Sequence, residues 1–196
     1  MNLRVEALTG AALEAALDHV AQLRIAVFRA WPYLYDGDLA YERRYLQTYR
    51  DSPGAVLAGA FDGARLVGAA TGTPMEDHAA DFAAPFAATG LELSDIFYCA
   101  ESVLLPEYRG QGAGHRFFDI REGHARRIGR RYVAFCGVVR PENHAEKPHD
   151  YRPLDGFWRS RGYAALPGVI AEFRWKDIGE TTESAKPLQF WMKELT

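Results

Sequence analysis

The sequence has little cysteine, no long apolar run and no excess of positive charge. Its 196 residues carry a formal net charge of −3 and include 2 cysteines. A negative net charge argues against a general nucleic-acid binder, which is normally basic. Glu14, Asp18 and Arg24 interrupt the Ala/Leu-rich stretch that begins at Ala11, so it does not read as a membrane span. The sequence therefore predicts neither a nucleic-acid partner nor a membrane partner.

The two cysteines and the N-terminal residues favour a cytoplasmic location. Cys99 and Cys136 lie within apolar, strand-like runs, where we expect reduced core thiols rather than a disulfide framework. The first residues are polar and charged, and they leave no apolar region of the kind that a signal peptide requires. No repeat or linker divides the chain, whose 48% hydrophobic and 25% charged residues are ordinary for a globular protein. We expect one domain over residues 1–196.

Hydrophobic periodicity predicts a mixed order of strands and helices. Asp38 is placed to cap the second helix, and Asp62-Gly63 between two apolar runs is a strong hairpin signal. Residues 75–90 are expected to form a loop with a short helix. The predicted strands cover residues 3–8, 55–61, 65–73, 95–105, 131–139, 163–176 and 188–195, and the predicted helices cover residues 9–30, 38–50, 117–128 and 154–161.

The most informative stretch runs from Glu101 to Gly114. It begins as an apolar run and ends in Arg109 followed by alternating glycines, of which Gly110 and Gly112 are the first two. The apolar periodicity of a helix begins directly after it. Glycine lets main-chain amides approach a ligand closely and tolerates positive φ. The unpaired amides of the first helical turn then favour an anion, most naturally a phosphate or pyrophosphate.

Two well-known phosphate motifs do not fit this turn. A P-loop needs Lys and then Ser or Thr after its last glycine, where His115 and Arg116 stand instead. A dinucleotide fingerprint needs two residues between its second and third glycines. It also needs an acidic residue about 20 positions further on, and residues 131–139 offer none. Two possibilities remain: a third phosphate-binding motif, or a glycine-rich turn that binds no ligand.

That third motif fits. Residues 109–114, Arg-Gly-Gln-Gly-Ala-Gly, resemble the R/Q-x-x-G-x-G/A motif of the GNAT acyltransferases, which holds the pyrophosphate of acetyl-CoA on main-chain amides. Residues 157–163, which end in Gly-Tyr, resemble the closing Gly-Phe/Tyr element of that superfamily, and the resemblance extends over essentially the whole chain. It implies an α/β (α+β) fold, the GNAT acyl-CoA acyltransferase fold, with a mixed central sheet of about seven strands flanked by helices. It also implies acetyl-CoA as a cosubstrate.

The resemblance assigns the cofactor contacts residue by residue. Main-chain atoms at the end of the fourth strand would pair with the pantetheine arm, and amides of the glycine turn would hold the pyrophosphate. Arg109 would add charge or shape the loop. The apolar side chains of the strand are uninformative about this role, because such residues are core by default. The expected cofactor-binding residues are Val103, Leu104, Leu105, Arg109, Gln111, Gly112, Ala113, Gly114 and His115.

Glu101 is the expected general base. It interrupts two apolar runs, where a charge is costly unless it is paired or used. In many members of the superfamily an acidic residue near this position takes the proton of the amine. A structural carboxylate, bonded to a neighbouring Arg or to a main-chain amide, is the alternative.

The general acid is less clearly marked. The superfamily's usual acid is a Tyr four residues before the glycine of the closing element, and Trp158 stands there. An indole cannot protonate a thiolate, so we expect Tyr151, in the Pro/His-rich loop 140–152, as the substitute. An aromatic packing residue is the alternative. Because thiol pKa values are about 8–9, a CoA thiolate can also leave without an acid.

The loop between the first two helices lines the acceptor side in the GNAT fold. It contains Trp31, Tyr33, Tyr35 and Asp36, and aromatic faces with a carboxylate suit a cationic amine. A loop packed by its own aromatic rings is the alternative. The paired histidines of loop 140–152 make a weak set of ligands, so no metal is expected.

These residues predict an acyl-CoA-dependent N-acyltransferase that transfers an acetyl group to an amine by direct attack in a ternary complex. The expected acceptor is a small molecule. Two alternatives stay open: a GNAT-fold acyl-CoA-binding sensor or scaffold without turnover, and an acetyltransferase that acts on a protein N-terminus or lysine. An exposed last strand could pair with a second subunit to form a homodimer.

Overall fold

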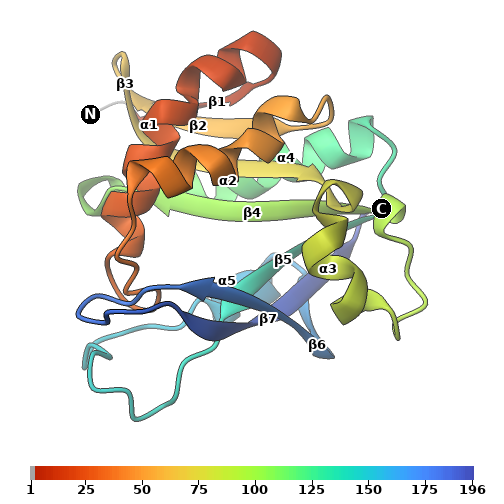
Figure 1. Ribbon diagram of the computed structural model, residues 1–196. Coiled ribbons are helices and arrows are strands. Elements are labelled where there is room, and N and C mark those ends of the chain that lie inside the picture. Colours follow the sequence, from red (N-terminus) through yellow and green to blue (C-terminus); the bar gives the residue numbers. More distant parts are fainter. Residues whose placement is uncertain (1–2) are drawn as a thin grey trace.

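The computed structural model describes residues 3–196, which form a seven-stranded sheet with helices on both faces (Figure 1). The strand order is β1-β2-β3-β4-β5-β7-β6, and only β4 and β5 are parallel. The predicted mixed sheet is therefore confirmed. The strands are β1 (Arg4–Leu8), β2 (Val56–Asp62), β3 (Arg65–Pro74), β4 (Ile96–Leu104), β5 (Tyr132–Val138), β6 (Ala164–Trp175) and β7 (Ser184–Glu194). The helices are α1 (Gly10–Phe28), α2 (Leu39–Asp51), α3 (Ala79–Phe86), α4 (Ala113–Arg127) and α5 (Asp155–Ser160).

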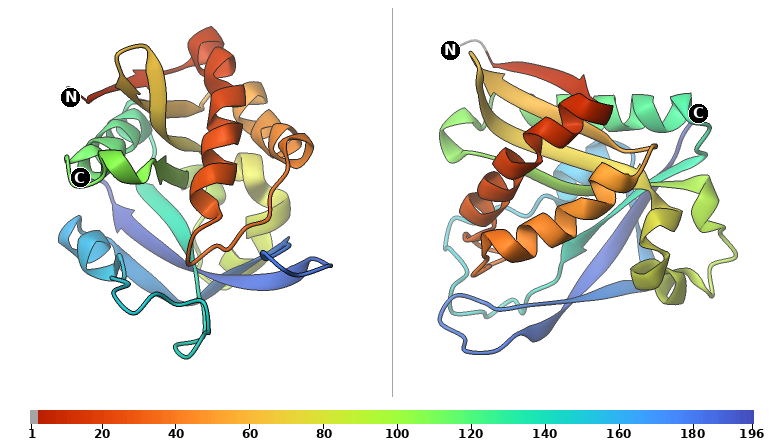
Figure 2. Two further views of the ribbon diagram at one scale, coloured as in Figure 1. Left: turned by 90° about the vertical axis from the view of Figure 1, so that its left-hand side faces the viewer. Right: turned by 45° about the horizontal axis from the view of Figure 1, so that its top comes forward.

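Helices α1 and α2 cover one face of β1–β4, and α4 covers the opposite face (Figure 2). Buried apolar side chains of α1 and α2, among them Leu13 and Leu46, form one cluster with the sheet. The Asp38 carboxylate accepts hydrogen bonds from the main-chain N–H groups of Ala40 at 2.9 Å and Tyr41 at 3.0 Å, so it caps α2 as predicted. The start of α2 is thereby fixed beside the end of the loop that follows α1.

Strands β4 and β5 separate after a short stretch of parallel pairing. Residues 96–98 of β4 pair with residues 132–134 of β5. Beyond this stretch β4 continues to Leu104 and β5 to Val138 without further pairing between them. The main chain of β4 after Tyr98 is therefore open on the side that faces β5.

A β-bulge in β4 changes which side chains face α1. At this point β4 has one residue more than β3, so Ala100 and Glu101 together oppose Thr71. The guanidinium of Arg121, from α4 and 1% exposed, donates to the carbonyl oxygens of Thr71 at 3.3 Å and Glu101 at 3.1 Å. A buried carbonyl without a partner is costly, so these hydrogen bonds stabilise the bulge. Arg121 makes them from the α4 face of the sheet, opposite the face that α1 covers.

Some element boundaries differ from the prediction. Helix α4 begins at Ala113, four residues before Phe117, because Gly112 adopts a left-handed φ of +79 and ends the glycine turn there. Strand β7 begins at Ser184 rather than Leu188, because its pairing with β6 extends further than its apolar run. Residues 75–90 contain a short 3-10 helix as well as α3. Within residues 3–196, none of the helices combines the length and apolar character that a membrane crossing needs.

Candidate active site

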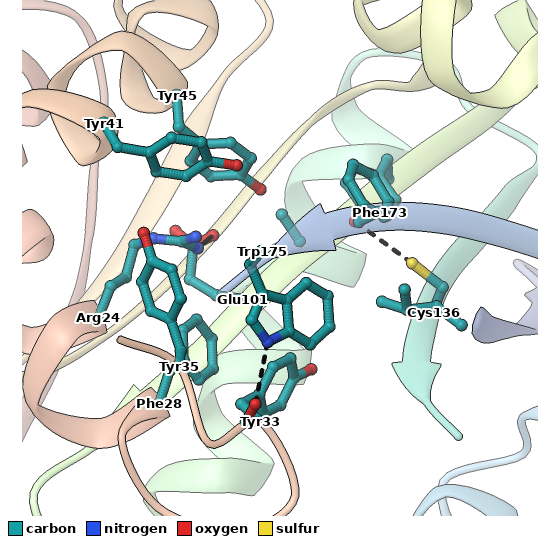
Figure 3. Close-up of a pocket in the computed structure, with 13 residues that line it drawn as sticks. Arg24, Phe28, Tyr33, Tyr35, Tyr41, Tyr45, Glu101, Cys136, Phe173 and Trp175 are labelled. Carbon is teal, nitrogen blue, oxygen red and sulfur yellow. Dashed lines mark hydrogen bonds and ion pairs between the residues drawn. The ribbon is translucent and has the colours of Figure 1, made fainter. Parts of the chain in front are cut away.

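A pocket lies between the α1–α2 loop and the point where β4 and β5 separate (Figure 3). Its cavity volume is about 90 Å³. Arg24 and Glu101 are the charged residues of its wall, and Figure 3 shows their side chains meeting beneath Tyr41 and Tyr45. Most of the wall is aromatic. The aromatic residues are Phe28, Tyr33, Tyr35, Tyr41, Tyr45, Tyr98, Phe173 and Trp175.

Glu101 reaches the pocket because of the bulge in β4. Cys99, two residues earlier, packs with Phe118 on the α4 side, and regular alternation would send Glu101 to that side as well. The extra residue turns Glu101 toward α1 instead. Arg24 Nη1 donates to Glu101 Oε2 at 2.6 Å, and Thr71 Oγ1 donates to Oε1 at 2.6 Å. Both carboxylate oxygens are therefore held in place, and the side chain is 1% exposed.

Arg24 joins Glu101 to a second buried carboxylate, that of Glu42 in α2. Arg24 Nε donates to Glu42 Oε2 at 2.5 Å, and the Arg24 guanidinium carbon lies 4.1 Å from the centre of the Tyr45 ring. Burial opposes the charge of Arg24, but the two carboxylates outweigh it and hold the pKa of Arg24 well above its ordinary value. One guanidinium between two ionised carboxylates leaves a single net negative charge. Among residues 3–196, Glu42 Oε1 is buried without a hydrogen-bond partner.

The hydroxyl groups of the wall are neutral. Burial raises the pKa of Tyr33, Tyr45 and Tyr98, which keeps these side chains protonated at neutral pH. The Tyr98 hydroxyl lies 3.6 Å from Cys136 Sγ, where β4 and β5 separate. Burial also raises the pKa of Cys136 to about 12, so this residue is a thiol rather than a nucleophilic thiolate.

The α1–α2 loop is fixed against the end of β6. Arg140 Nε donates to the Pro32 carbonyl at 2.8 Å, and Arg140 Nη2 donates to the Tyr33 carbonyl at 2.7 Å. The same guanidinium makes hydrogen bonds of 2.7 and 2.9 Å to the two carboxylate oxygens of Asp177. Trp175 Nε1 adds a hydrogen bond of 3.0 Å to the Tyr33 carbonyl. These contacts hold the Tyr33 ring in the pocket wall.

Two of the four loop residues predicted to contact the acceptor line the pocket. They are Tyr33 and Tyr35. Trp31 is not part of the wall, and its ring packs against the loop that follows β5. The Asp36 carboxylate is also outside the wall and pairs with Lys176 Nζ at 2.8 Å. The structure therefore separates the loop into a pocket-facing part and an outward-facing part.

Tyr151 and Trp158 both lie outside the pocket wall. The Tyr151 ring meets the ring of Trp31 edge-on, with 5.9 Å between ring centres. Trp158 packs in the core beside Phe135 and Trp191, at ring-centre distances of 4.9 and 5.1 Å. The indole that stands at the superfamily's usual Tyr position thus contributes to packing here.

The glycine turn has the geometry of an anion site. Gly110 and Gly112 have φ angles of +76 and +79, which side chains rarely adopt. In the described chain, the first turn of α4 contains no acidic residue and no side chain caps it. Its N–H groups are therefore available to an anion, with the helix dipole in support. The ring of His115 packs against Phe157 with 4.9 Å between ring centres.

The other predicted cofactor residues lie beside this turn. Residues 103–105 carry β4 beyond its separation from β5 and into the turn, and residues 111–115 form the turn and the start of α4. Arg109 Nε donates to the Leu104 carbonyl at 3.4 Å, which ties the turn to the strand. The structure thus brings the open edge of β4 and the start of α4 next to each other.

Several pocket residues were missed in the sequence. Arg24 lies one helical turn after Val20 on the apolar stripe of α1. A lone charge among apolar residues could have marked it, as it marked Glu101 in its strand. Phe173 and Trp175 of β6 gave no comparable signal, because apolar rings on strands are core by default. Residues 3–196 contain no group of three or more His, Cys, Asp or Glu side chains placed to hold a metal ion.

An acyl-CoA acyltransferase fold has a parallel strand pair that separates and a glycine turn that opens a helix. Both features are present here, and the pocket lies where the two strands separate. Residues 13–148 match the Acetyltransferase (GNAT) family, and the chain belongs to this family. None of the curated proteins matches the chain in sequence.

Solved structures share the fold at low sequence identity. An N-acetyltransferase of Staphylococcus aureus Mu50 has a TM-score of 0.61 and 10% identity, over 100% of both chains. The ribosomal-protein-alanine N-acetyltransferase of Brucella melitensis has a TM-score of 0.60 and 15% identity, over 98% of this chain and 99% of that chain. For yncA of Salmonella typhimurium, with its cofactor acetyl-CoA, the TM-score is 0.56 and the identity 13%, over 100% of this chain and 95% of that chain. At these identities the likeness establishes the fold alone.

Proposed function

We propose that this protein is an acetyl-CoA-dependent N-acetyltransferase that acts on a small amine. The observation that carries the proposal is that the pocket wall includes Tyr98, Ala100 and Cys136, which lie where β4 and β5 separate. A pantetheine arm paired with the open edge of β4 would present its thioester at this end of the pocket. The acetyl-CoA in the structure of yncA, which shares the fold, supports this choice of cosubstrate.

The glycine turn is the proposed pyrophosphate site. The amides of residues 111–115 would donate to the phosphate oxygens, and α4 would add the positive end of its dipole. Arg109 would hold the turn against β4 through its contact with the Leu104 carbonyl. Residues 103–105 would supply main-chain partners for the pantetheine arm.

Glu101 is the proposed acceptor of the ammonium proton. A carboxylate has about four acceptor positions, and Arg24 and Thr71 occupy one on each oxygen of Glu101. The second acceptor position on each oxygen would receive the proton of the ammonium group.

The deprotonated nitrogen attacks the thioester carbonyl carbon directly in the ternary complex. A C–N bond forms, the C–S bond breaks, and CoA leaves with the electron pair as a thiolate. A thiol pKa of about 8–9 makes this a good leaving group near neutral pH. The nitrogen loses one further proton as it becomes an amide, and this proton ends on the thiolate to give the free thiol of CoA. Tyr151 as the group that protonates the thiolate stays a prediction.

Thermal unfolding with and without acetyl-CoA tests the cofactor site, with NAD and ATP as controls. A ligand that binds only the folded protein raises Tm, so a rise with acetyl-CoA and not with the controls is expected. Thiol release from acetyl-CoA in the presence of primary amines then tests turnover. A rise in Tm without thiol release from any amine would instead identify an acyl-CoA-binding protein without turnover.

A further inference from the structure

We infer that the acceptor is a primary amine carried on an apolar body, such as an aralkylamine, and that it bears no carboxylate. This inference rests on the N-acetyltransferase activity proposed above and narrows its acceptor to a chemical class. It follows from three properties of the pocket: the composition of the wall, the net charge behind it and the way its one guanidinium is used.

The wall offers mostly ring surface, and its polar side-chain groups are tyrosine hydroxyls, a thiol and one ion pair. Its charged groups, Arg24 and Glu101, already bind each other at 2.6 Å. Two of its hydroxyl groups also have protein neighbours, because Tyr45 lies 3.2 Å from the Tyr49 hydroxyl and Tyr98 lies near a thiol. A sugar or a polyamine buried here would leave several polar groups without hydrogen bonds, which is costly. An apolar body would instead bury its surface against the rings.

The charge behind the wall favours a cation in the pocket. Arg24 is shared by Glu42 and Glu101, so the cluster carries one net negative charge when both carboxylates are ionised. Glu42 also lies close to the Tyr35 hydroxyl of the wall, and burial together with this carboxylate raises the pKa of Tyr35. An ammonium group in the pocket would offset this charge and would also be attracted to the faces of the surrounding rings.

The same charge disfavours a carboxylate on the acceptor. Arg24 is the one cation among the described residues that line the pocket, and two carboxylates already use it. Two nearby cations, Arg140 and Lys186, both pair with Asp177. An amino acid would therefore bring a second negative charge into a partly buried site that has no spare cation to receive it.

The test compares 2-phenylethylamine with phenylalanine, which differ by one carboxylate, and with spermidine, which has several amines and no ring. The kcat/KM from thiol release should be about 100-fold or more higher for 2-phenylethylamine than for phenylalanine, because like charges are brought together only in the second case. Spermidine should also be a poor acceptor. Comparable or better use of phenylalanine or spermidine overturns the inference and leaves the N-acetyltransferase activity in place.

A matched pair of variants tests whether the charge of the cluster causes the preference for 2-phenylethylamine. Glu42→Gln removes the charge behind Arg24 without facing the pocket, and it should reduce the preference for 2-phenylethylamine over phenylalanine by about tenfold or more. Glu14→Gln, on the exposed side of α1, should leave the preference unchanged. An unchanged preference in folded Glu42→Gln overturns the electrostatic explanation, and the wild-type comparison decides the acceptor class without either variant. If acetyl-CoA raises Tm and none of the three amines releases thiol, the inference fails, whereas the proposed activity fails only when no primary amine at all releases thiol.

Discussion

Arg24 Nη1 and Glu101 Oε2 lie 2.6 Å apart, and this ion pair joins α1 to the bulge of β4. The same guanidinium binds Glu42 of α2. A change at Glu101 therefore affects the chemistry of the pocket and also the packing of two helices. Activity and stability have to be measured separately for every variant of this cluster.

The variant Glu101→Gln should lower kcat about 100-fold or more and leave the Kd of acetyl-CoA nearly unchanged. The amide keeps the shape of the side chain and one oxygen that accepts hydrogen bonds, but it cannot take the proton of the amine. Thiol release measures kcat, calorimetric titration measures Kd, and urea unfolding measures the accompanying change in stability. Loss of acetyl-CoA binding would mean that Glu101 is structural.

The matched control is Thr71→Val. It removes one hydrogen bond to the Glu101 carboxylate, keeps the shape of the side chain and leaves the carboxylate in place. We expect it to reduce the free energy of unfolding by about 1 kcal/mol and to retain most of kcat. Equal losses of kcat in Thr71→Val and Glu101→Gln would assign Glu101 a structural role.

The variant Gly112→Asp should abolish binding of acetyl-CoA. A carboxylate at this position would repel the pyrophosphate, and the φ of +79 strains any residue with a side chain. Gly112→Asn meets the same backbone strain as Gly112→Asp but carries no charge, so it should bind acetyl-CoA more tightly than Gly112→Asp. Gly129→Asp places the same strain, at φ +77, beyond the other end of α4. This control should bind acetyl-CoA as tightly as the unmodified protein. Retained binding in Gly112→Asp would refute the pyrophosphate site.

The variant Arg140→Leu should raise KM for the amine about tenfold while the Kd of acetyl-CoA stays the same. Arg140 holds the main chain of Pro32 and Tyr33, so its loss releases one side of the acceptor pocket. The free energy of unfolding should fall by roughly 3–5 kcal/mol, because Asp177 loses its main partner in a largely buried pair.

The control for this variant is Arg131→Leu, which breaks an exposed pair with Glu194. It should leave both the free energy of unfolding and KM nearly unchanged, because solvent screens an exposed pair. An unaltered KM in folded Arg140→Leu would show that the hydrogen bonds of Arg140 to the α1–α2 loop do not position the pocket wall.

The variant His78→Phe should make stability less dependent on pH. Burial lowers the pKa of His78 and outweighs the carboxylates of Asp81 and Asp77, which act in the opposite direction. The folded protein therefore binds fewer protons than the unfolded chain, whose His pKa is about 6.5, and stability is lost as pH falls from there toward the lower pKa of the folded state. Phe fits the same cage of rings, formed in part by Phe82 and Tyr98.

Measurements of Tm between pH 8 and pH 5 test this variant. The fall in Tm at low pH should be shallower in His78→Phe than in the unmodified protein. It should not vanish, because burial also lowers the pKa of His124, although the Gly54 carbonyl partly opposes this shift. Parallel curves for the two proteins would contradict the prediction.

The order of strands and helices could be predicted because periodicity, turns and caps are local properties of the chain. Asp38 caps α2 through amides only two and three residues away. The bulge in β4 could not be predicted in the same way. It depends on pairing with Thr71 in another strand and on a guanidinium that arrives from α4. Alternation along β4 alone would have placed Glu101 on the wrong face of the sheet.

The candidate site was predictable where a polar residue stands out locally. Glu101 interrupts an apolar strand, and the alternating glycines mark the turn. Arg24 and Glu42 stand out in the same way on the apolar stripes of two helices, but only the fold shows that they meet at one point. The rings of β6 could not be assigned to the pocket, because a buried aromatic residue and a pocket-lining one look identical in a sequence.

The short pairing between β4 and β5 also affects local unfolding of the sheet. Among residues 3–196, β4 and β5 pair through three residue pairs, and one further main-chain hydrogen bond of 2.9 Å runs from the Arg131 N–H group to the Asp95 carbonyl just before the two strands. Each half of the sheet can therefore behave as its own cooperative unit, with its own rate of amide exchange. A cosubstrate that pairs with the open edge of β4 would act as a missing strand segment. Its binding would couple the two halves of the sheet, so that their main-chain amides exchange as a single unit.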